Sequence, residues 1–230
     1  MTVLVVAAHP DDEVLGCGGT MARFAQEKND VHVLILGEGL TSRFKEASTA
    51  PASEKEKLRG QARAAGALLG AKSVTLHGLP DNRFDTVPLL EIVKAIEMKI
   101  EELKPDTIFT QHGGDLNIDH ELTFRAVLTA TRPLAGSCVK RVYAYAVPSS
   151  TEWSFQKFDP VFRPNTFVDI AATLEKKIEA MALYDGESRA FPHPRSAQAL
   201  RAHAQYWGSV AGLHAAEAFE LIREVRRSTE

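Results

Sequence analysis

The sequence predicts an α/β protein with a Rossmann-like, doubly wound and mostly parallel sheet, covered by helices on both faces in three layers. Short apolar runs at residues 3–8 and 31–36 enclose a helical segment, and such a β-α-β unit opens this kind of sheet. Apolar runs and helical segments then alternate along the chain. Clusters of polar residues follow the first and fourth apolar runs, where an open parallel sheet binds its ligands.

The individual elements follow from hydrophobic periodicity and from the glycines and prolines that interrupt it. Strands are expected at residues 3–8, 31–36, 73–76, 107–111, 141–147 and 166–169. Helices are expected at residues 20–28, 53–69, 88–103, 119–131, 171–184, 196–206 and 215–226.

Residues 1–230 are expected to form a single domain, because no repeat, low-complexity tract or clear linker divides them. The stretch of residues 149–165 departs from the alternation, since it is rich in proline and aromatic residues. We expect this stretch to be a lid or an insertion.

Composition excludes several classes of partner. Hydrophobic residues make up 44% and charged residues 25% of the 230, and the formal net charge is −3. The basic residues form no stripe that would follow a phosphate backbone, so no nucleic acid is expected as a partner. The apolar run at residues 3–8 is too short to span a membrane and follows no basic leader. Cys17 and Cys138 form no CxxC pair, which favours a reducing, cytoplasmic location. The composition leaves open whether the protein forms a homo-oligomer.

Two polar clusters suggest a metal site. His9 and Asp12 follow the first strand, and His120 ends a polar loop after the fourth. These strands are neighbours in a doubly wound sheet, so the clusters should face each other. Two imidazoles and one carboxylate suit a catalytic zinc, which leaves a fourth position for water. We therefore expect one Zn²⁺ per chain, although iron or another divalent metal suits the same ligands.

Asp11 stands beside the expected ligand Asp12 on the same turn. One carboxylate can bind the metal while the other takes the proton of the activated water. The structural alternative is a simple turn before a capped helix, with Asp119 as the helix cap and His120 on the surface. The two clusters taken together favour the metal site.

The glycine-rich run at residues 16–19 has a second interpretation, as a dinucleotide-binding loop. The third glycine of that motif would fall at Met21, and the acidic turn before the run would repel a pyrophosphate. Close packing of a helix against a strand is the preferred interpretation.

The run Ala8-His9-Pro10-Asp11-Asp12-Glu13, with Asp119-His120 after the fourth strand, resembles the PIG-L, or LmbE-like, deacetylase family. The resemblance covers about the first two thirds of the chain. It implies a Rossmann-like fold and zinc-dependent removal of acetyl from N-acetylglucosamine-containing or related small molecules. It also implies that His9, Asp12 and His120 bind the metal and that Asp11 is the general base.

Other residues carry weaker matches to the family. Arg43 and Asp81 lie where members place substrate-binding residues, and a solvated surface role is the alternative for each. Many members carry a histidine three residues before the last ligand, where this chain has Asn117. An amide can donate a hydrogen bond to an oxyanion but supplies no proton. The proton for the leaving amine would then come from Asp11, His112 or His193.

The loop at residues 191–196 holds two prolines and two candidate substrate-binding residues, His193 and Arg195. A rigid polar loop of this kind often presents side chains to a cleft, and an ordinary connector is the alternative. His112 is a further candidate, either for the substrate or for orienting a metal ligand.

The expected function is metal-dependent hydrolysis of an N-acetyl or other N-acyl group on an amino sugar. Two alternatives remain open. One is a metal-dependent amidohydrolase that acts on a non-sugar amide, and the other is a Rossmann-type protein that binds a nucleotide or sugar without catalysis.

Overall fold

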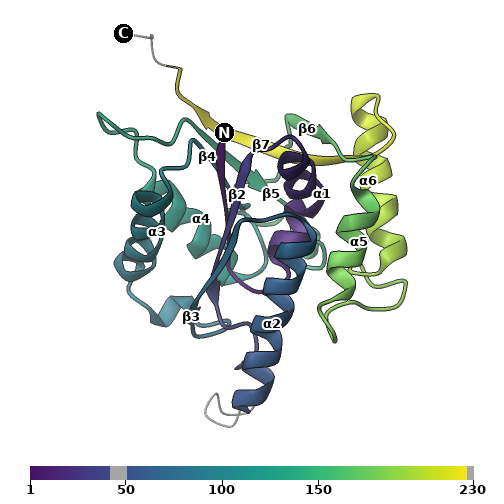
Figure 1. The fold of residues 1–230 in the computed structure, drawn as a ribbon, viewed down its shortest axis with the longest axis horizontal. Coiled ribbons are helices and arrows are strands. Elements are labelled where there is room, and N and C mark those ends of the chain that lie inside the picture. The colour runs from purple at the N-terminus through teal and green to yellow at the C-terminus, as the bar shows by residue number, and fades with distance from the viewer. Residues whose placement is uncertain (42–50, 227–230) are drawn as a thin grey trace.

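A computed structural model describes residues 1–41 and 51–226 (Figure 1). The described strands form one seven-stranded sheet in the order β3-β2-β1-β4-β5-β7-β6. The strands are β1 (Thr2–Ala7), β2 (Asp30–Gly37), β3 (Ser73–Leu79), β4 (Thr107–Gln111), β5 (Arg141–Tyr145), β6 (Thr166–Asp169) and β7 (Ala216–Glu224). The helices are α1 (Asp12–Gln26), α2 (Ala52–Leu68), α3 (Leu89–Leu103), α4 (Ile118–Ala130), α5 (Leu174–Ala182) and α6 (Ala197–Ala211), with short 3-10 helices η3 (Phe84–Thr86) and η4 (Glu152–Ser154).

Strand β1 shows why the chain folds into three layers. Val3 and Val5 face a core beneath α1, α2, α5 and α6, whereas Leu4 and Val6 face a second core beneath α3 and α4. Successive side chains of a strand point to opposite faces, so a strand that is apolar throughout must be covered on both. The two groups of helices lie on opposite sides of the sheet (Figure 1). The three-layer α/β prediction is confirmed.

The chain reverses direction of winding between β1 and β4. β1 pairs in parallel with β2 on one side and with β4 on the other. Ligands bind beyond the carboxyl ends of strands at such a switch point, because the connections leave to opposite faces there. The predicted adjacency of the two polar clusters follows from this pairing.

The predicted helix at residues 215–226 is wrong, because this segment is strand β7. β7 lies between β5 and β6 and runs antiparallel to both. It places Phe219 in one core and packs Ile222 against the other. Apolar residues on both faces remove the alternation that would have revealed a strand in the sequence.

The glycine-rich run lies inside α1, which begins at Asp12 rather than at the predicted residue 20. The helix is interrupted at Cys17, where φ is −143°. A Cβ on Gly16 would lie 2.1 Å from the ring of Tyr145, and one on Gly19 would lie 2.8 Å from Ile170. These glycines allow close packing, as the preferred interpretation predicted, and they face protein rather than a phosphate.

The stretch of residues 149–165 carries the short helix η4 and no strand. It lies against the loop after β4, where a Cβ on Gly114 would come within 1.8 Å of the Pro160 carbonyl oxygen. This contact fixes the stretch beside the polar cluster of the fourth strand. Its role as a lid and the single-domain organisation stay predictions.

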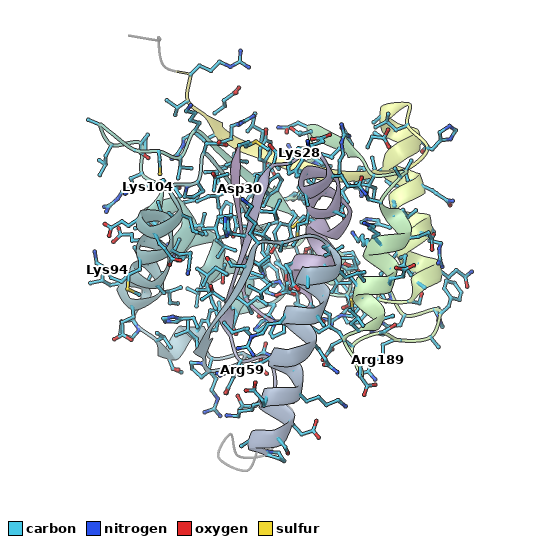
Figure 2. All side chains as sticks on the ribbon, viewed as in Figure 1. Lys28, Asp30, Arg59, Lys94, Lys104 and Arg189 are labelled. Carbon is cyan, nitrogen blue, oxygen red and sulfur yellow. The ribbon has the colours of Figure 1, made fainter. Side chains whose placement is uncertain are left out.

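Charged side chains lie on the surface of the described residues. Lys94 and Arg189 are examples at its periphery (Figure 2). No helix in residues 1–41 and 51–226 is long and apolar enough to cross a bilayer.

Candidate active site

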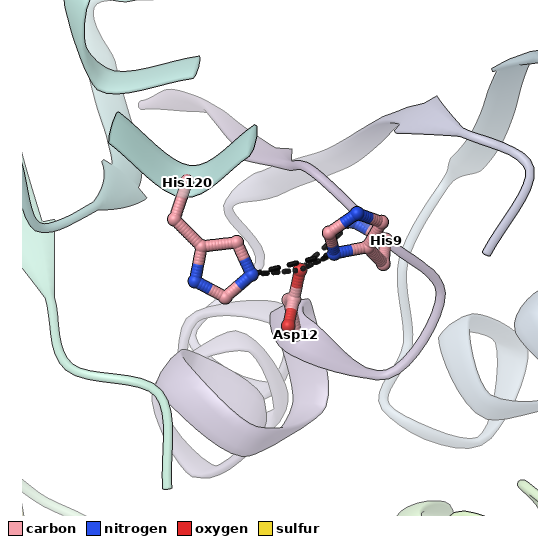
Figure 3. Close-up of side chains that lie close together, drawn as sticks. All are labelled: His9, Asp12 and His120. Carbon is pink, nitrogen blue, oxygen red and sulfur yellow. Dashed lines mark hydrogen bonds and ion pairs between the residues drawn. The ribbon is translucent and has the colours of Figure 1, made fainter. Parts of the chain in front are cut away.

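His9, Asp12 and His120 meet at the switch point of the sheet (Figure 3). His9 follows β1, Asp12 begins α1, and His120 lies in the first turn of α4. His9 Nδ1 lies 3.4 Å from Asp12 Oδ2 and 3.3 Å from His120 Nε2, and His120 Nε2 lies 3.2 Å from Asp12 Oδ2. Three buried ligand atoms thus form a nearly equilateral triangle.

The triangle fits a tetrahedral metal ion. With bonds of about 2.0–2.1 Å, the ligand atoms of tetrahedral zinc lie roughly 3.3–3.4 Å apart. The three measured separations of 3.2–3.4 Å match this spacing. Three protein ligands leave a fourth position open, as catalytic zinc sites do. The predicted ligands are therefore brought together in a group able to hold a metal.

The ring of His9 is oriented by two further acids. Its Nε2 lies 2.9 Å from Asp119 Oδ2 and 3.4 Å from Asp81 Oδ1. Asp119 Oδ1 accepts a 2.9 Å hydrogen bond from the backbone N–H of Phe84, which fixes the carboxylate. A carboxylate on Nε2 keeps the proton there and leaves the Nδ1 lone pair for a metal. Asp119 therefore orients His9, and the helix-cap interpretation of Asp119 is wrong.

His120 is oriented in the same manner by an acid that the sequence analysis missed. Its Nδ1 lies 3.1 Å from Asp115 Oδ1, which leaves Nε2 for the metal. Asp115 also accepts hydrogen bonds from the hydroxyls of Ser150 and Thr151. The position of Asp115 in the polar loop after β4 was the signal in the sequence for this role. The sequence alone does not say which acid of that loop contacts the His120 ring.

The surroundings of Asp12 favour the ionised form of its carboxyl group. Its Oδ2 accepts hydrogen bonds from the His9 backbone N–H at 2.8 Å and from Gln111 Nε2 at 2.9 Å. Burial raises the pKa of Asp12, but the nearby His120 and His9 rings together outweigh burial and hold the pKa well below its usual range. The side chain therefore remains a carboxylate, as a metal ligand requires.

The two imidazoles sit in a strongly negative environment. Burial lowers the pKa of His9, but hydrogen bonds with Asp119 and Asp12 outweigh it and raise this pKa to about 10. Burial acts likewise on His120, whose pKa Asp12 and Asp115 raise to about 9. Acids surround both rings, so the cluster attracts positive charge, and a metal competes with protons for the same nitrogens.

Asp11 lies on the same turn in an unusual backbone conformation, with φ at +106°. Positive φ is strained for a residue with a Cβ, so the turn needs support. The Asp11 backbone N–H donates to Glu13 Oε2 at 3.1 Å, and the hydroxyl of buried Tyr184 donates to Glu13 Oε1. Glu13 and Tyr184 thus hold the turn that presents Asp11, a function that the sequence analysis did not assign.

The Asp11 carboxylate is paired with Arg195. Arg195 Nη1 lies 2.6 Å from Asp11 Oδ2 and 2.9 Å from Glu187 Oε2, and its Nε donates to Ser149 Oγ at 2.7 Å. Burial raises the pKa of Asp11 to about 7, although Arg195 opposes the rise. A carboxyl group that titrates near neutral pH is suited to take up and release a proton.

A small polar pocket of about 160 Å³ opens over the triangle. We call it the metal pocket. Its lining includes seven residues predicted for the site: His9, Asp11, Asp12, Asp81, Asn117, His120 and Arg195. Also in the lining are Pro10, Gly39, Asn82, Ser149, Ser150 and Glu187.

Asn117 lies at the rim of the metal pocket and is the N-cap of α4. Its Oδ1 accepts from the Asp119 backbone N–H at 2.9 Å, and its Nδ2 donates to Asn82 Oδ1 at 3.0 Å. The amide thus fixes the start of the helix that carries His120 and also presents a donor group at the pocket.

Two predicted substrate-binding residues that the structure describes, His112 and His193, do not line the metal pocket. His112 is fully buried between the rings of Phe124 and Phe162, with Nε2 3.3 Å from Glu220. It does not line the metal pocket, and its assignment to the substrate stays a prediction. His193 packs against Trp153 and does not line the metal pocket, so its contact with the substrate stays a prediction. Arg43 lies outside the described residues.

The fold and the site define a Rossmann-like α/β protein with two histidines and an aspartate placed to hold a metal at the switch point. The sequence profile of the PIG-L family, described as GlcNAc-PI de-N-acetylase, matches residues 4–131, more than half of the chain. The chain belongs to the PIG-L family of deacetylases, and the resemblance of the two motifs is confirmed.

Known relatives include enzymes of two reaction types. The 1D-myo-inositol 2-acetamido-2-deoxy-alpha-D-glucopyranoside deacetylase of Mycobacteroides abscessus is 27% identical over 228 residues, covering 88% of this chain and 80% of that protein. The 4-oxalmesaconate hydratase of Pseudomonas putida is 26% identical over 196 residues, covering 81% of this chain and 74% of that protein. N,N'-diacetylchitobiose deacetylase from Pyrococcus horikoshii shares the fold with a TM-score of 0.76 at 19% identity, covering 96% of this chain and 84% of that one.

Proposed function

We propose that the protein is a zinc-dependent hydrolase that removes an N-acetyl or other N-acyl group from an amino sugar or sugar conjugate. The triangle of His9 Nδ1, Asp12 Oδ2 and His120 Nε2 carries this proposal, because its edges of 3.2–3.4 Å suit one divalent ion with a free fourth position. Zinc is the preferred ion for two imidazoles and a carboxylate, and another divalent metal is the alternative.

The bound metal would supply a water molecule with a pKa near 7 and a positive charge that polarises the acyl oxygen. Asp11 would accept a proton from the attacking water as the water oxygen bonds to the acyl carbon. It then returns the proton to the amide nitrogen as the C–N bond breaks, so that the products are the free acid and the amine. One group performs both transfers, which suits a carboxyl with a pKa of about 7.

Neighbouring side chains set up these transfers. Arg195 holds Asp11 at 2.6 Å and keeps one carboxylate oxygen fixed at the pocket wall. Asn117 offers its amide hydrogen to the oxygen that gains negative charge, and such donors commonly contribute a large part of catalysis. The lost family histidine is thereby replaced in its hydrogen-bonding role, while Asp11 carries the proton.

The proposed substrate is a small N-acetylated amino sugar or conjugate. Relatives named for acetamido-sugar and diacetylchitobiose substrates support this class. Asp81 and Asn82 line the metal pocket with acceptor and donor groups suited to sugar hydroxyls. Arg43 remains a proposed substrate contact, and the cytoplasm remains the proposed location.

Asp11→Asn tests the base directly. We expect kcat for acetate release from N-acetylglucosamine derivatives to fall roughly 10²–10⁴-fold, the usual contribution of a general base. Zinc content, measured by elemental analysis, should stay at the wild-type level, since Asp11 is outside the triangle. Asp30→Asn, at the start of β2, is the matched control. Near-normal turnover in the Asp11 variant would exclude it as the base.

Hydration of an unsaturated acid is the second candidate, because the hydratase relative is nearly as similar as the deacetylase relative. The same metal and base would add water to a carbon–carbon double bond instead of an amide. Loss of ultraviolet absorbance from an unsaturated dicarboxylate, without acetate release from any acetylated sugar, would favour this function over the deacetylase.

A further inference from the structure

A second, larger cavity lies next to the metal pocket. Its volume is about 520 Å³, within the range of sites that enclose small molecules. It is bounded by residues 146–162, the loop at residues 192–194 and helix α6. We call it the aromatic chamber, lined by Gly114, Ala146, Pro148, Thr151, Glu152, Ser154, Gln156, Phe158, Val161, Phe162, Pro192, Pro194, Ala199, His203, Tyr206 and Trp207.

The walls of the aromatic chamber are mostly apolar and carry little charge. Glu152 is the charged residue among the described lining residues, and its Oε1 already accepts a hydrogen bond from the Ser149 backbone N–H. His203 Nε2 accepts a 3.0 Å hydrogen bond from Trp207 Nε1, so this nitrogen carries no proton and the ring is neutral. The chamber therefore suits an uncharged group, and aromatic walls favour one that contains a ring.

Large apolar side chains stay exposed around the chamber. Phe158 and Tyr206 line it and are 49% and 57% exposed. Phe155 and Phe191, close by in the sequence, are 74% and 59% exposed. A concentration of exposed aromatic residues beside a cavity of this size is unusual for a surface without a ligand.

The chamber and the metal pocket share a thin wall. Ser149 and Ser150 line the metal pocket, whereas Pro148 and Thr151 line the chamber. The same division recurs in the loop at residues 191–196, where Arg195 lines the metal pocket and Pro194 lines the chamber. A molecule bound at the metal therefore lies one chain thickness from the chamber.

The wall is also connected to a metal ligand. Thr151, which lines the chamber, donates its hydroxyl to Asp115. Asp115 in turn lies 3.1 Å from His120 Nδ1. A group that fills the chamber thus touches Thr151, whose hydroxyl binds the acid that orients His120.

The metal pocket, at about 160 Å³, is small for a whole substrate. Enclosed ligand sites usually measure roughly 300–1,000 Å³. The pocket has room for the scissile amide and its immediate surroundings, so any large substituent must extend beyond it. Among the described residues, the aromatic chamber is a neighbouring volume with room for such a substituent.

We propose that the aromatic chamber binds an uncharged, apolar substituent of ring size or larger on the amide substrate that is cleaved at the metal pocket. The substituent sits on either the acyl side or the glycosidic side, since both present the same chemistry. Inositol, the group in the name of the Mycobacteroides abscessus relative, is a polyol and suits such walls poorly. The preferred substrate of this chain is therefore more apolar than that conjugate.

Kinetics on matched substrates test the specificity. The pairs are the methyl and phenyl β-glycosides of N-acetylglucosamine, and N-acetyl and N-hexanoyl glucosamine. In one pair, the wild type should prefer the apolar member by roughly tenfold or more in kcat/KM, as burial of such a group predicts. Trp207→Ala, and Phe158→Ala at a more exposed position, should reduce this kcat/KM ratio to below about twofold. The pair that shows the preference identifies the side of the substrate that carries the substituent.

Phe155→Ala is the matched control, because Phe155 belongs to the same segment but does not line the chamber. Its apolar-to-polar ratio should equal that of the wild type. If neither pair shows a preference in the wild type, or if both chamber variants keep it, the chamber does not bind the substrate.

Because this inference rests on the proposed hydrolase function, a binding measurement separates the two. Trp153→Phe leaves Trp207 as the single tryptophan of the chain. In this background, with Asp11→Asn to prevent turnover, the apolar member of the preferred pair, phenyl glycoside or N-hexanoyl glucosamine, should change Trp207 fluorescence saturably, and its polar partner should not. Amide hydrolysis without such a change from either apolar compound overturns the chamber alone, whereas the change without hydrolysis of any of the four compounds overturns the hydrolase function alone.

Discussion

Two buried clusters of charge lie against the first half of helix α1, and they are balanced differently. In one, Lys177 Nζ binds Glu217 Oε1 at 2.6 Å and the Leu15 carbonyl at 2.8 Å. Glu217 also accepts from the backbone N–H groups of Gly19 and Thr20 at 3.0 and 2.7 Å, capping the helix just past its interruption. Lysine and glutamate there neutralise each other within the protein.

The cluster at the metal pocket lacks that balance. Four carboxylates surround two imidazoles, and Asp12, Asp115 and Asp119 lie within 3.4 Å of a ring nitrogen. Uncompensated buried charge costs several kcal/mol, so an arrangement of this kind persists only with a counter-charge. A buried acidic cluster therefore indicates a cation site when the protein supplies too few cations of its own.

Removing a metal ligand should have the largest effect. His120→Ala breaks the triangle, so we expect zinc affinity and kcat/KM each to fall by more than roughly 10³-fold. Titration calorimetry of the metal-free protein and an acetate assay measure the two losses. The exposed His77→Ala is the control. Unchanged zinc affinity in the His120 variant would contradict the ligand assignment.

Breaking the balanced cluster should affect folding instead. Lys177→Met leaves Glu217 buried without its counter-charge, so we expect the free energy of unfolding to fall by about 3–5 kcal/mol. Urea denaturation measures this loss, with the exposed neighbour Lys176→Met as the control. Zinc affinity of the folded variant should stay within about twofold of the wild type, and a parallel loss would show that the clusters are not independent.

Removing the charge of Asp115, the acid that orients His120, should lower zinc affinity by less. Asp115→Asn keeps the shape but weakens the hold on the His120 ring, so zinc affinity should fall roughly 10–100-fold. Competition with a fluorescent chelator measures the change. Asp85→Asn, exposed in η3, supplies the comparison. Wild-type affinity in the Asp115 variant would mean that this contact does not orient the ligand.

The support of the Asp11 turn should give the smallest effect. Tyr184→Phe removes the hydroxyl that binds Glu13, and we expect a loss of about 1–3 kcal/mol in unfolding free energy. A several-fold fall in kcat at unchanged zinc content should accompany it, because Asp11 loses its fixed position. Tyr143→Phe, on β5 and in the lining of neither the metal pocket nor the aromatic chamber, keeps its ring stacked on Phe109 and should change neither value. A stability loss with kcat unchanged would assign Tyr184 to folding alone.

The features that depend on local sequence pattern could be predicted from the sequence. β1 is a continuous apolar run, and His9, Asp11 and Asp12 follow it within one turn, so their grouping needs no distant information. His120 joins them because β1 and β4 are adjacent at the switch point, which the fold class itself implies.

Contacts between distant segments were beyond reach of the sequence. Arg195 was predicted to reach the substrate, but it pairs with Asp11 across 184 positions. β7 carries apolar residues on both faces, so its periodicity resembled that of a helix. The side of β4 to which His112 turns depends on packing against Phe162, which no spacing in the sequence reveals.

Metal content of the purified wild-type protein tests the central claim most directly. Elemental analysis after dialysis, followed by removal with a chelator and readdition of zinc, should show about one divalent ion per chain. Acetate release should disappear with the ion and return when zinc is added. A folded protein that binds no divalent metal at this site would contradict the claim.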